Sequence, residues 1–167
     1  MKPLEINRYP NCILRKKCVL VERITEDEIR LFDEMLFTVR HFGGMGLAAP
    51  EIGMDRSLIV INIKGDVIKM ANPAILDKRG FVQFQEGCLS FPGLNMRIGR
   101  ADKIVVRGLN EKGKIVEFRA EGLLSRVLQH EIDHLKGKLI IDYLGLLGRA
   151  RLFKSRFVKP GFRHVCL

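Results

Sequence analysis

Residues 121–136 read EGLLSRVLQHEIDHLK, and their apolar positions recur with the spacing of a largely buried helix that Gly137 ends. His130 and His134 lie four positions apart, which on a helix places both imidazoles on one face, a single turn from each other. Two imidazoles so placed can chelate one metal ion, and Glu131 beside them can act as a general base. This stretch therefore predicts a buried, metal-binding helix.

A catalytic metal site usually has three protein ligands, so this helix needs a third. A zinc peptidase would supply it downstream, but Ile140 stands where a metzincin has its third histidine, and no Glu follows His134. Upstream, EGCLS (residues 86–90) offers the thiolate of Cys88, a strong metal ligand. The residues alone favour Cys88 and leave Asp142 and His164 as downstream candidates.

The remaining pattern predicts an α+β domain, because strands and helices do not alternate regularly. Thr25 and Glu28 form a capping box at the start of a helix that ends near Gly43 and Gly44. β-Branched or alternating stretches predict strands at 57–63, 66–70 and 74–76, a hairpin of 103–109 with 114–120, and a short strand at 139–141. A basic helix is expected over 146–157. The glycine-rich loop at 43–53 is no phosphate-binding loop, since it follows a helix and lacks the G-K-[ST] triplet.

Length and charge limit the number of domains and the kinds of partner that the chain can have. A chain of 167 residues fits one domain, and its 29 Lys and Arg against 19 Asp and Glu give a net charge of +10. That surplus indicates an anionic partner such as nucleic acid, or simply a basic soluble surface. No stretch resembles a signal peptide or a membrane span. We therefore expect a reducing compartment in which the cysteines at 12, 18, 88 and 166 are free thiols.

Three segments together resemble a known family. GMGLAAPEIG (44–53), EGCLS (86–90) and QHEIDH (129–134), in this order and spacing, are similar to the three motifs of peptide deformylases, and the resemblance extends over nearly the whole chain. It implies an α+β fold with mixed or antiparallel sheets around a central helix that carries HExxH. It also implies a metal-dependent hydrolase that removes the N-formyl group from the initiator methionine of nascent chains and releases formate.

The resemblance also assigns roles to residues around the metal. Cys88, His130 and His134 match the metal ligands, and the family's native ion is typically Fe²⁺, with Zn²⁺, Ni²⁺ or Co²⁺ able to replace it. Glu131 matches the base, and the backbone N–H of Leu89 matches one donor to the oxyanion. The backbone of Gly46 matches a position that pairs with the extended substrate.

Further matches concern the substrate pocket and the support of the ligands. Met45, Phe84, Leu123 and Val127 match positions that wall the methionine pocket, although ordinary core packing would explain them equally. Glu86 and Arg100 match an acid and a base that pair behind the ligands.

One position departs from the family pattern. Glu51 stands where deformylases carry the Gln whose amide donates to the oxyanion, and an ionised carboxylate can only accept. Either Glu51 is held protonated, or the enzyme is slow, or its role has changed. The alternative hypothesis is accordingly a deformylase-like metal protein of low or no activity that docks on ribosomes, and an HExxH peptidase is a third reading.

The expected organisation is one deformylase-like domain over residues 1–167, in which about 145–167 form a basic C-terminal helix and tail. Expected partners are formyl-methionyl nascent peptides and, through that basic segment, the ribosome, with no membrane and no DNA. The expected location is a bacterial-type cytoplasm, with an organellar matrix as the alternative.

Overall fold

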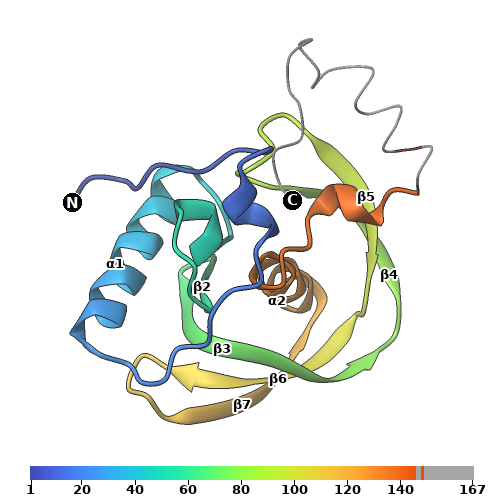
Figure 1. Ribbon diagram of the computed structural model, residues 1–167. Coiled ribbons are helices and arrows are strands. Elements are labelled where there is room, and N and C mark those ends of the chain that lie inside the picture. The colour runs from blue at the N-terminus through green and yellow to red at the C-terminus, as the bar shows by residue number, and fades with distance from the viewer. Residues whose placement is uncertain (146–147, 149–167) are drawn as a thin grey trace.

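Seven strands form two antiparallel sheets within residues 1–145 and 148, the part of the chain that the computed structural model describes (Figure 1). The larger sheet has the order β1-β2-β3-β6-β7, and β4 pairs with β5 alone. The strands are β1 (Gly46–Ala48), β2 (Leu58–Ile63), β3 (Asp66–Arg79), β4 (Val82–Gly87), β5 (Asn95–Arg100), β6 (Lys103–Asn110) and β7 (Ile115–Glu121). The expected α+β class with antiparallel sheets is confirmed. No helix in the described residues is long and apolar enough to cross a membrane.

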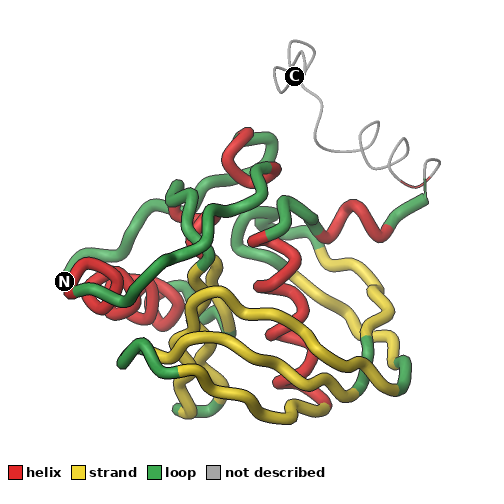
Figure 2. Tube along the Cα trace, turned by 60° about the horizontal axis from the view of Figure 1, so that its bottom comes forward, coloured by secondary structure: helices red, strands yellow, loops and turns green. Residues whose placement is uncertain are grey.

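Helix α2 (Gly122–Leu135) follows β7 without a loop and lies at the centre of the fold. Figure 1 shows it end-on, with β2, β3 and β6 to one side and β4 and β5 to the other. Its buried Val127, Leu128, Ile132 and Leu135 pack with apolar residues of the larger sheet. In Figure 2 the same helix runs alongside the strands.

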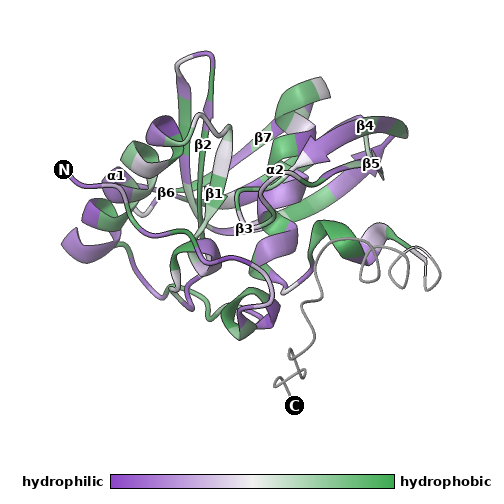
Figure 3. Cartoon of the chain, turned by 90° about the horizontal axis from the view of Figure 1, so that it is seen from above, coloured by the Kyte–Doolittle hydropathy of each residue, from purple (hydrophilic) through white to green (hydrophobic). Residues whose placement is uncertain are grey.

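Helix α1 (Glu26–His41) covers the opposite side of the larger sheet. The backbone N–H of Thr25 donates to the Glu28 carboxylate at 3.0 Å, as the capping box predicts. Figure 3 shows both hydrophobic and hydrophilic residues along this helix. The buried hydrophobic ones, including Phe32 and Met35, form a second core cluster with β1 and β2.

A third core cluster joins segments that are far apart in the sequence. It contains Leu14 of the short 3-10 helix η1 (Cys12–Arg15), Ile98 of β5 and the buried residues 139–141. Cys88 packs against it.

Two predicted strands, at 66–70 and 74–76, are in fact one. β3 continues through both, with register shifts between Ala71 and Ala74 and between Ile75 and Asp77. The interruption accommodates Pro73, which has no N–H to give to the ladder, so proline does not end the strand here.

The prediction of a strand at 139–141 was wrong, because this segment leads into the 3-10 helix η3 (Ile140–Tyr143). The Asp142 carboxylate accepts from the Leu139 N–H at 2.8 Å, and Asp142 N–H donates back to the Leu139 carbonyl at 2.9 Å. Leu139, Ile140 and Ile141 are all buried, so the apolar run reflects a buried turn rather than a ladder. The basic helix expected over 146–157 lies outside the described residues, apart from residue 148.

The expectation of free thiols holds for Cys18 and Cys88. It was wrong for Cys12, which is disulfide-bonded.

Candidate metal centre

Helix α2 presents His130 and His134 one turn apart, as their spacing predicts. The helix ends where it does because Gly137 adopts a φ of +69°, and a Cβ there would lie 2.3 Å from the carbonyl oxygen of Arg15. Glycine is therefore required at this turn on two grounds, backbone conformation and space.

Cys88 reaches the same point from the smaller sheet. It follows the last residue of β4, in a turn that the Phe91 N–H closes by donating to the Cys88 carbonyl at 2.9 Å. Its Sγ lies 3.2 Å from His134 Nε2. Among the described residues, Cys88, His130 and His134 are the one group of His, Cys, Asp or Glu whose ligand atoms all lie within 4.8 Å of one another.

The chemistry of these atoms fits a divalent cation. Burial lowers the pKa of His134 to about 4, so its imidazole is neutral at neutral pH and keeps a lone pair for a metal. Burial raises the pKa of Cys88, and the nearby carboxylates of Glu51 and Glu131 raise it further. A cation at this point would offset the charge of the thiolate and of both carboxylates.

The other downstream candidates are not part of this group. Asp142 lies in η3, where it pairs with Arg15 at 2.5 Å and caps the turn. His164 lies outside the described residues.

His130 is oriented from behind by Glu86 of β4. Its Nδ1 lies 3.1 Å from Glu86 Oε2, which leaves Nε2 for a metal. Arg100 of β5 forms the expected ion pair with Glu86 through two bonds, Nε to Oε1 at 2.6 Å and Nη2 to Oε2 at 2.9 Å. Both side chains are buried, and this bidentate geometry fixes the carboxylate that holds His130.

Glu131 is buried between the ligands and strand β1. Its side chain lies so close to Gly46 that a Cβ there would be 2.3 Å from Glu131 Oε1, so a larger residue at this strand position would have to displace the Glu131 carboxylate. Glu131 Oε2 is buried without a hydrogen-bond partner among the described residues. Burial first, and the Glu51 charge second, raise the pKa of Glu131 well above its usual value. A carboxylate whose proton affinity is raised in this way suits proton transfer near neutral pH.

Glu51 lies in the 3-10 helix η2 (Ala49–Ile52), next to Cys88. Both of its oxygens act as acceptors: Oε2 takes the Ala48 N–H at 3.1 Å, and Oε1 takes the Ser90 hydroxyl at 2.9 Å. Burial opposes ionisation of Glu51, while the Ala48 N–H and the Ser90 hydroxyl stabilise the carboxylate and help to hold its pKa below the usual value. These contacts suit a carboxylate and do not favour the protonated, donating acid that the oxyanion role requires.

A cavity opens beside the ligands, lined by residues 42–46, 85–89 and 91–95 and by one side of α2. Met45, Gly46, Leu89 and Val127 line it, as does Glu131. Among the described residues its lining does not include Phe84 or Leu123. Phe84 instead lies under the guanidinium of Arg126, at 4.0 Å from the ring centre, and Leu123 packs against the first core cluster.

Sequence reasoning missed several residues around this centre. Arg126 lines the cavity one helical turn before His130, and Ser90 binds Glu51. Asp133 contacts Arg100 from within the HEIDH stretch, and Tyr143 contacts both. Ser90 and Asp133 lie inside the EGCLS and QHEIDH motifs, and this position could have marked them as site residues. No local sequence pattern marks Arg126 or Tyr143.

Comparison with known proteins decides what this arrangement is. The family model described as polypeptide deformylase matches residues 3–150. The chain belongs to the peptide deformylase family. A peptide deformylase from Thermodesulfovibrio yellowstonii is 42% identical, over 94% of this chain and 98% of its own length.

Solved structures agree with this assignment. A deformylase from Legionella pneumophila superposes with a TM-score of 0.87 at 40% identity, covering 92% of each chain. A deformylase from Acinetobacter baumannii, described as bound to Met-Ala-Ser, has a TM-score of 0.82 at 27% identity, covering 86% of this chain and 99% of that one. The family and the fold expected from the three motifs are thus confirmed, and with them a metal-dependent hydrolase of the deformylase type. The peptidase reading is not favoured.

Proposed function

We propose that this deformylase removes the N-formyl group from the initiator formyl-methionine of nascent polypeptides and releases formate. The observation that carries the proposal is the convergence of the ligand atoms of Cys88, His130 and His134, beside a cavity that Cys88, His130 and Glu131 line. The solved relative described as bound to Met-Ala-Ser supports a substrate of this type, since that peptide has the form of a deformylated N-terminus.

Cys88, His130 and His134 would hold the metal ion. When bound there, a divalent ion would make a water molecule acidic enough to act as a nucleophile near neutral pH. One thiolate and two imidazoles suit several ions, and we propose Fe²⁺ natively, with Zn²⁺, Ni²⁺ or Co²⁺ as replacements.

The chain's own groups supply the remaining chemistry. Glu131 accepts a proton from the attacking water and returns one to the leaving amine. Leu89 N–H donates to no backbone group in the described residues, so it is available to the oxyanion at the cavity wall. Gly46 contributes backbone groups that pair with an extended substrate, and Met45 and Val127 contribute apolar wall for the methionine side chain.

The experiment that tests this function is formate release from formyl-Met-Ala-Ser by freshly purified, anaerobically handled protein. Unformylated Met-Ala-Ser and a longer unformylated peptide serve as controls. Metal-dependent formate release from the first peptide alone is the expected result. Cleavage inside the unformylated peptide would restore the peptidase reading, and absence of both activities in the metal-loaded protein would favour the inactive, ribosome-docking alternative.

Cys88→Ala is expected to lose the metal, because only two imidazoles would remain to hold it. Metal analysis should find close to one ion per chain in the wild type and a minor fraction in the variant. Cys18→Ala is the matched control, since Cys18 is a free, buried thiol of the core and should keep the metal. Full metal content in Cys88→Ala would remove Cys88 from the ligand set.

We also propose that the whole chain is one domain whose basic C-terminal segment, about 145–167, docks on the ribosome in a bacterial-type cytoplasm. No Asp or Glu follows Asp142, whereas Arg149, Arg151, Lys154, Arg156, Lys159 and Arg163 are basic. Contacts to RNA phosphates release counterions, so such binding weakens steeply as salt rises.

Replacing these six residues by Gln should therefore abolish co-sedimentation with ribosomes at about 50 mM salt, where phosphate contacts are strong. The wild type should itself dissociate as salt is raised to about 200 mM. Lys112→Gln with Lys114→Gln, in the β6–β7 turn, is the control for a mere loss of charge. Equal binding of the six-fold variant and the wild type would contradict docking through this segment.

A further inference from the structure

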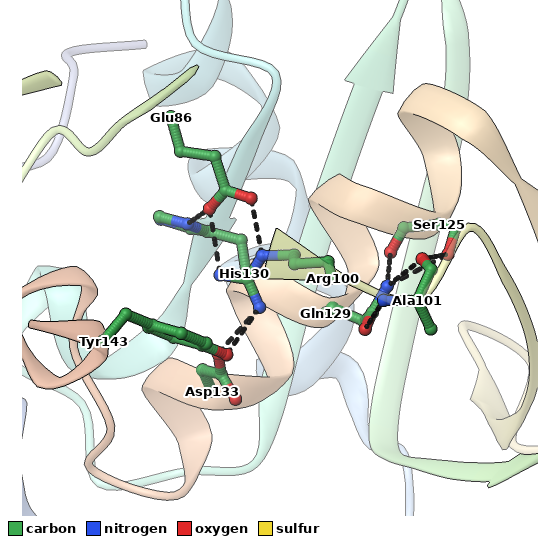
Figure 4. Close-up of polar contacts among 8 residues, drawn as sticks. All are labelled: Glu86, Arg100, Ala101, Ser125, Gln129, His130, Asp133 and Tyr143. Carbon is green, nitrogen blue, oxygen red and sulfur yellow. Dashed lines mark hydrogen bonds and ion pairs between the residues drawn. The ribbon is translucent and has the colours of Figure 1, made fainter. Parts of the chain in front are cut away.

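A buried network of charged groups extends from His130 away from the metal centre (Figure 4). Glu86 accepts the Nδ1–H of His130 and holds Arg100 through two of its nitrogens. The third nitrogen, Nη1, points to the other side and donates to Asp133 Oδ2 at 2.8 Å. Arg100 is thus fixed between two carboxylates, with its side chain only 3% exposed.

Tyr143 closes this network from η3. Its hydroxyl accepts from Arg100 Nη1 at 3.0 Å and donates to Asp133 Oδ2 at 2.6 Å. The three groups therefore form a triangle in which each hydrogen bond restrains the other two. Tyr143 is also held by its ring, since Lys138 Nζ lies 3.7 Å and the Arg100 guanidinium 5.0 Å from the ring centre.

The triangle determines how Arg100 is aimed. A guanidinium has five N–H donors in a rigid plane, so fixing Nη1 fixes the direction of Nε and Nη2 as well. Those two nitrogens set the position of the Glu86 carboxylate. An ionised carboxylate can only accept, so Glu86 keeps the proton of His130 on Nδ1 and leaves the lone pair on Nε2.

We propose that Tyr143, together with Asp133, is a positioning residue that acts through Arg100 and Glu86 to fix the ring and tautomer of His130. Neither residue touches the ligand atoms of the centre. The inference rests on the metal-binding role in the proposed function. It adds Tyr143 of η3 to the residues that determine metal affinity.

A neighbouring set of hydrogen bonds provides the contrast. Gln129 and Ser125 of α2 bond the backbone of Ala101, with the Ser125 hydroxyl donating to the Ala101 carbonyl at 3.0 Å. Figure 4 shows this set on the far side of Arg100 from Glu86 and His130. These hydrogen bonds join the end of β5 to α2, as the Arg100 network does, but none of them involves a side chain of Glu86 or His130.

The test is the affinity of Tyr143→Phe for Co²⁺, measured by competition with a chelator, together with the visible spectrum of the Co²⁺-loaded protein. Phenylalanine keeps the ring and removes only the hydroxyl. Loss of a partner that orients a ligand typically weakens metal binding about 10–100-fold. Because Tyr143 acts through two intervening residues, we expect about a tenfold loss and shifted cobalt bands.

Ser125→Ala is the matched control, because it deletes one hydrogen-bonded hydroxyl of α2 that lies outside the network around Arg100. It should lower the unfolding temperature and leave both the Co²⁺ affinity and the spectrum unchanged. Asp133→Asn should weaken binding as Tyr143→Phe does, and the double variant should lose less than the product of the two effects, since both act through the same nitrogen of Arg100.

Wild-type affinity and spectrum in Tyr143→Phe would overturn the proposal. If that variant does not fold, the same result in Asp133→Asn would overturn it. Neither measurement uses a substrate, so a protein without deformylase activity would still give a clear answer here.

Discussion

Glu131→Gln is expected to keep the metal and to release formate about 10²–10⁴ times more slowly than the wild type, the usual range for loss of a general acid–base group. The amide has nearly the shape of the carboxylate, so it fits the space against Gly46 where a single extra carbon would collide. It cannot accept the proton of the attacking water. The ligand set is unchanged, because Glu131 is not among the atoms that converge as metal ligands.

Two measurements on one sample check this expectation, the metal content and the rate of formate release. Glu121→Gln is the control, since Glu121 is an exposed acid immediately before the same helix and lies outside the cavity lining. A Glu131→Gln variant that keeps both metal and wild-type turnover would show that another group moves the proton. A variant that loses the metal would show that Glu131 supports the ligands instead.

Glu51→Gln is expected to accelerate formate release, by as much as about 10²–10³, the value usually lost when one oxyanion donor is removed. The existing contacts accommodate the amide. Its oxygen can accept the Ala48 N–H that Glu51 Oε2 now accepts. Its nitrogen then occupies the position of Oε1, where the Ser90 hydroxyl can rotate from donor to acceptor.

The charge of Glu51 adds to the expected gain. Its Oε1 lies 3.3 Å from Cys88 Sγ, and its charge raises the pKa of both Cys88 and Glu131. A negative group here opposes the developing oxyanion as well as the thiolate, and Gln removes that repulsion.

Glu51→Ala separates the two sources of the gain, because it removes the charge without supplying a donor. Acceleration in the Gln variant alone would identify amide donation, and equal acceleration in both would identify relief of repulsion. No acceleration in either would contradict the expectation and leave the Leu89 N–H and the metal to stabilise the oxyanion.

The parts of the fold with a local signal were predictable from the sequence. The capping box at Thr25, the spacing of His130 and His134, and the β6–β7 hairpin all depend on neighbours within a few residues. β4 and β5 were not predicted as strands, because β4 reads VQFQEG and pairs with a partner that reads NMRIGR. Val82 and Phe84 alternate with two glutamines, but this signal lasts only four residues, and the one buried position of the strand is the charged Glu86.

The site was predictable to the extent that its residues share a motif or a resemblance. The lack of a downstream third ligand favoured Cys88, but only the resemblance assigned it as a metal ligand. Cys88 lies 42 positions before His130, and the turn that presents it depends on β4 and β5. The contacts of Glu51 with Ser90 and of Tyr143 with Arg100 join residues 39 and 43 positions apart. Such contacts follow from tertiary packing, which no local period encodes.

The three core clusters give the metal a role beyond chemistry. His130 and His134 stand on a helix that packs in the first cluster, whereas Cys88 packs against the third, with Leu14 and the residues of η3. Separately packed regions open as distinct cooperative units in native-state hydrogen exchange. An ion bound across the boundary stabilises only the state in which both units are closed. With the metal bound, the regions around the first and third clusters should therefore open together. Without it, the backbone amides around η1 and η3 should exchange their hydrogens through a local opening in which α2 stays folded.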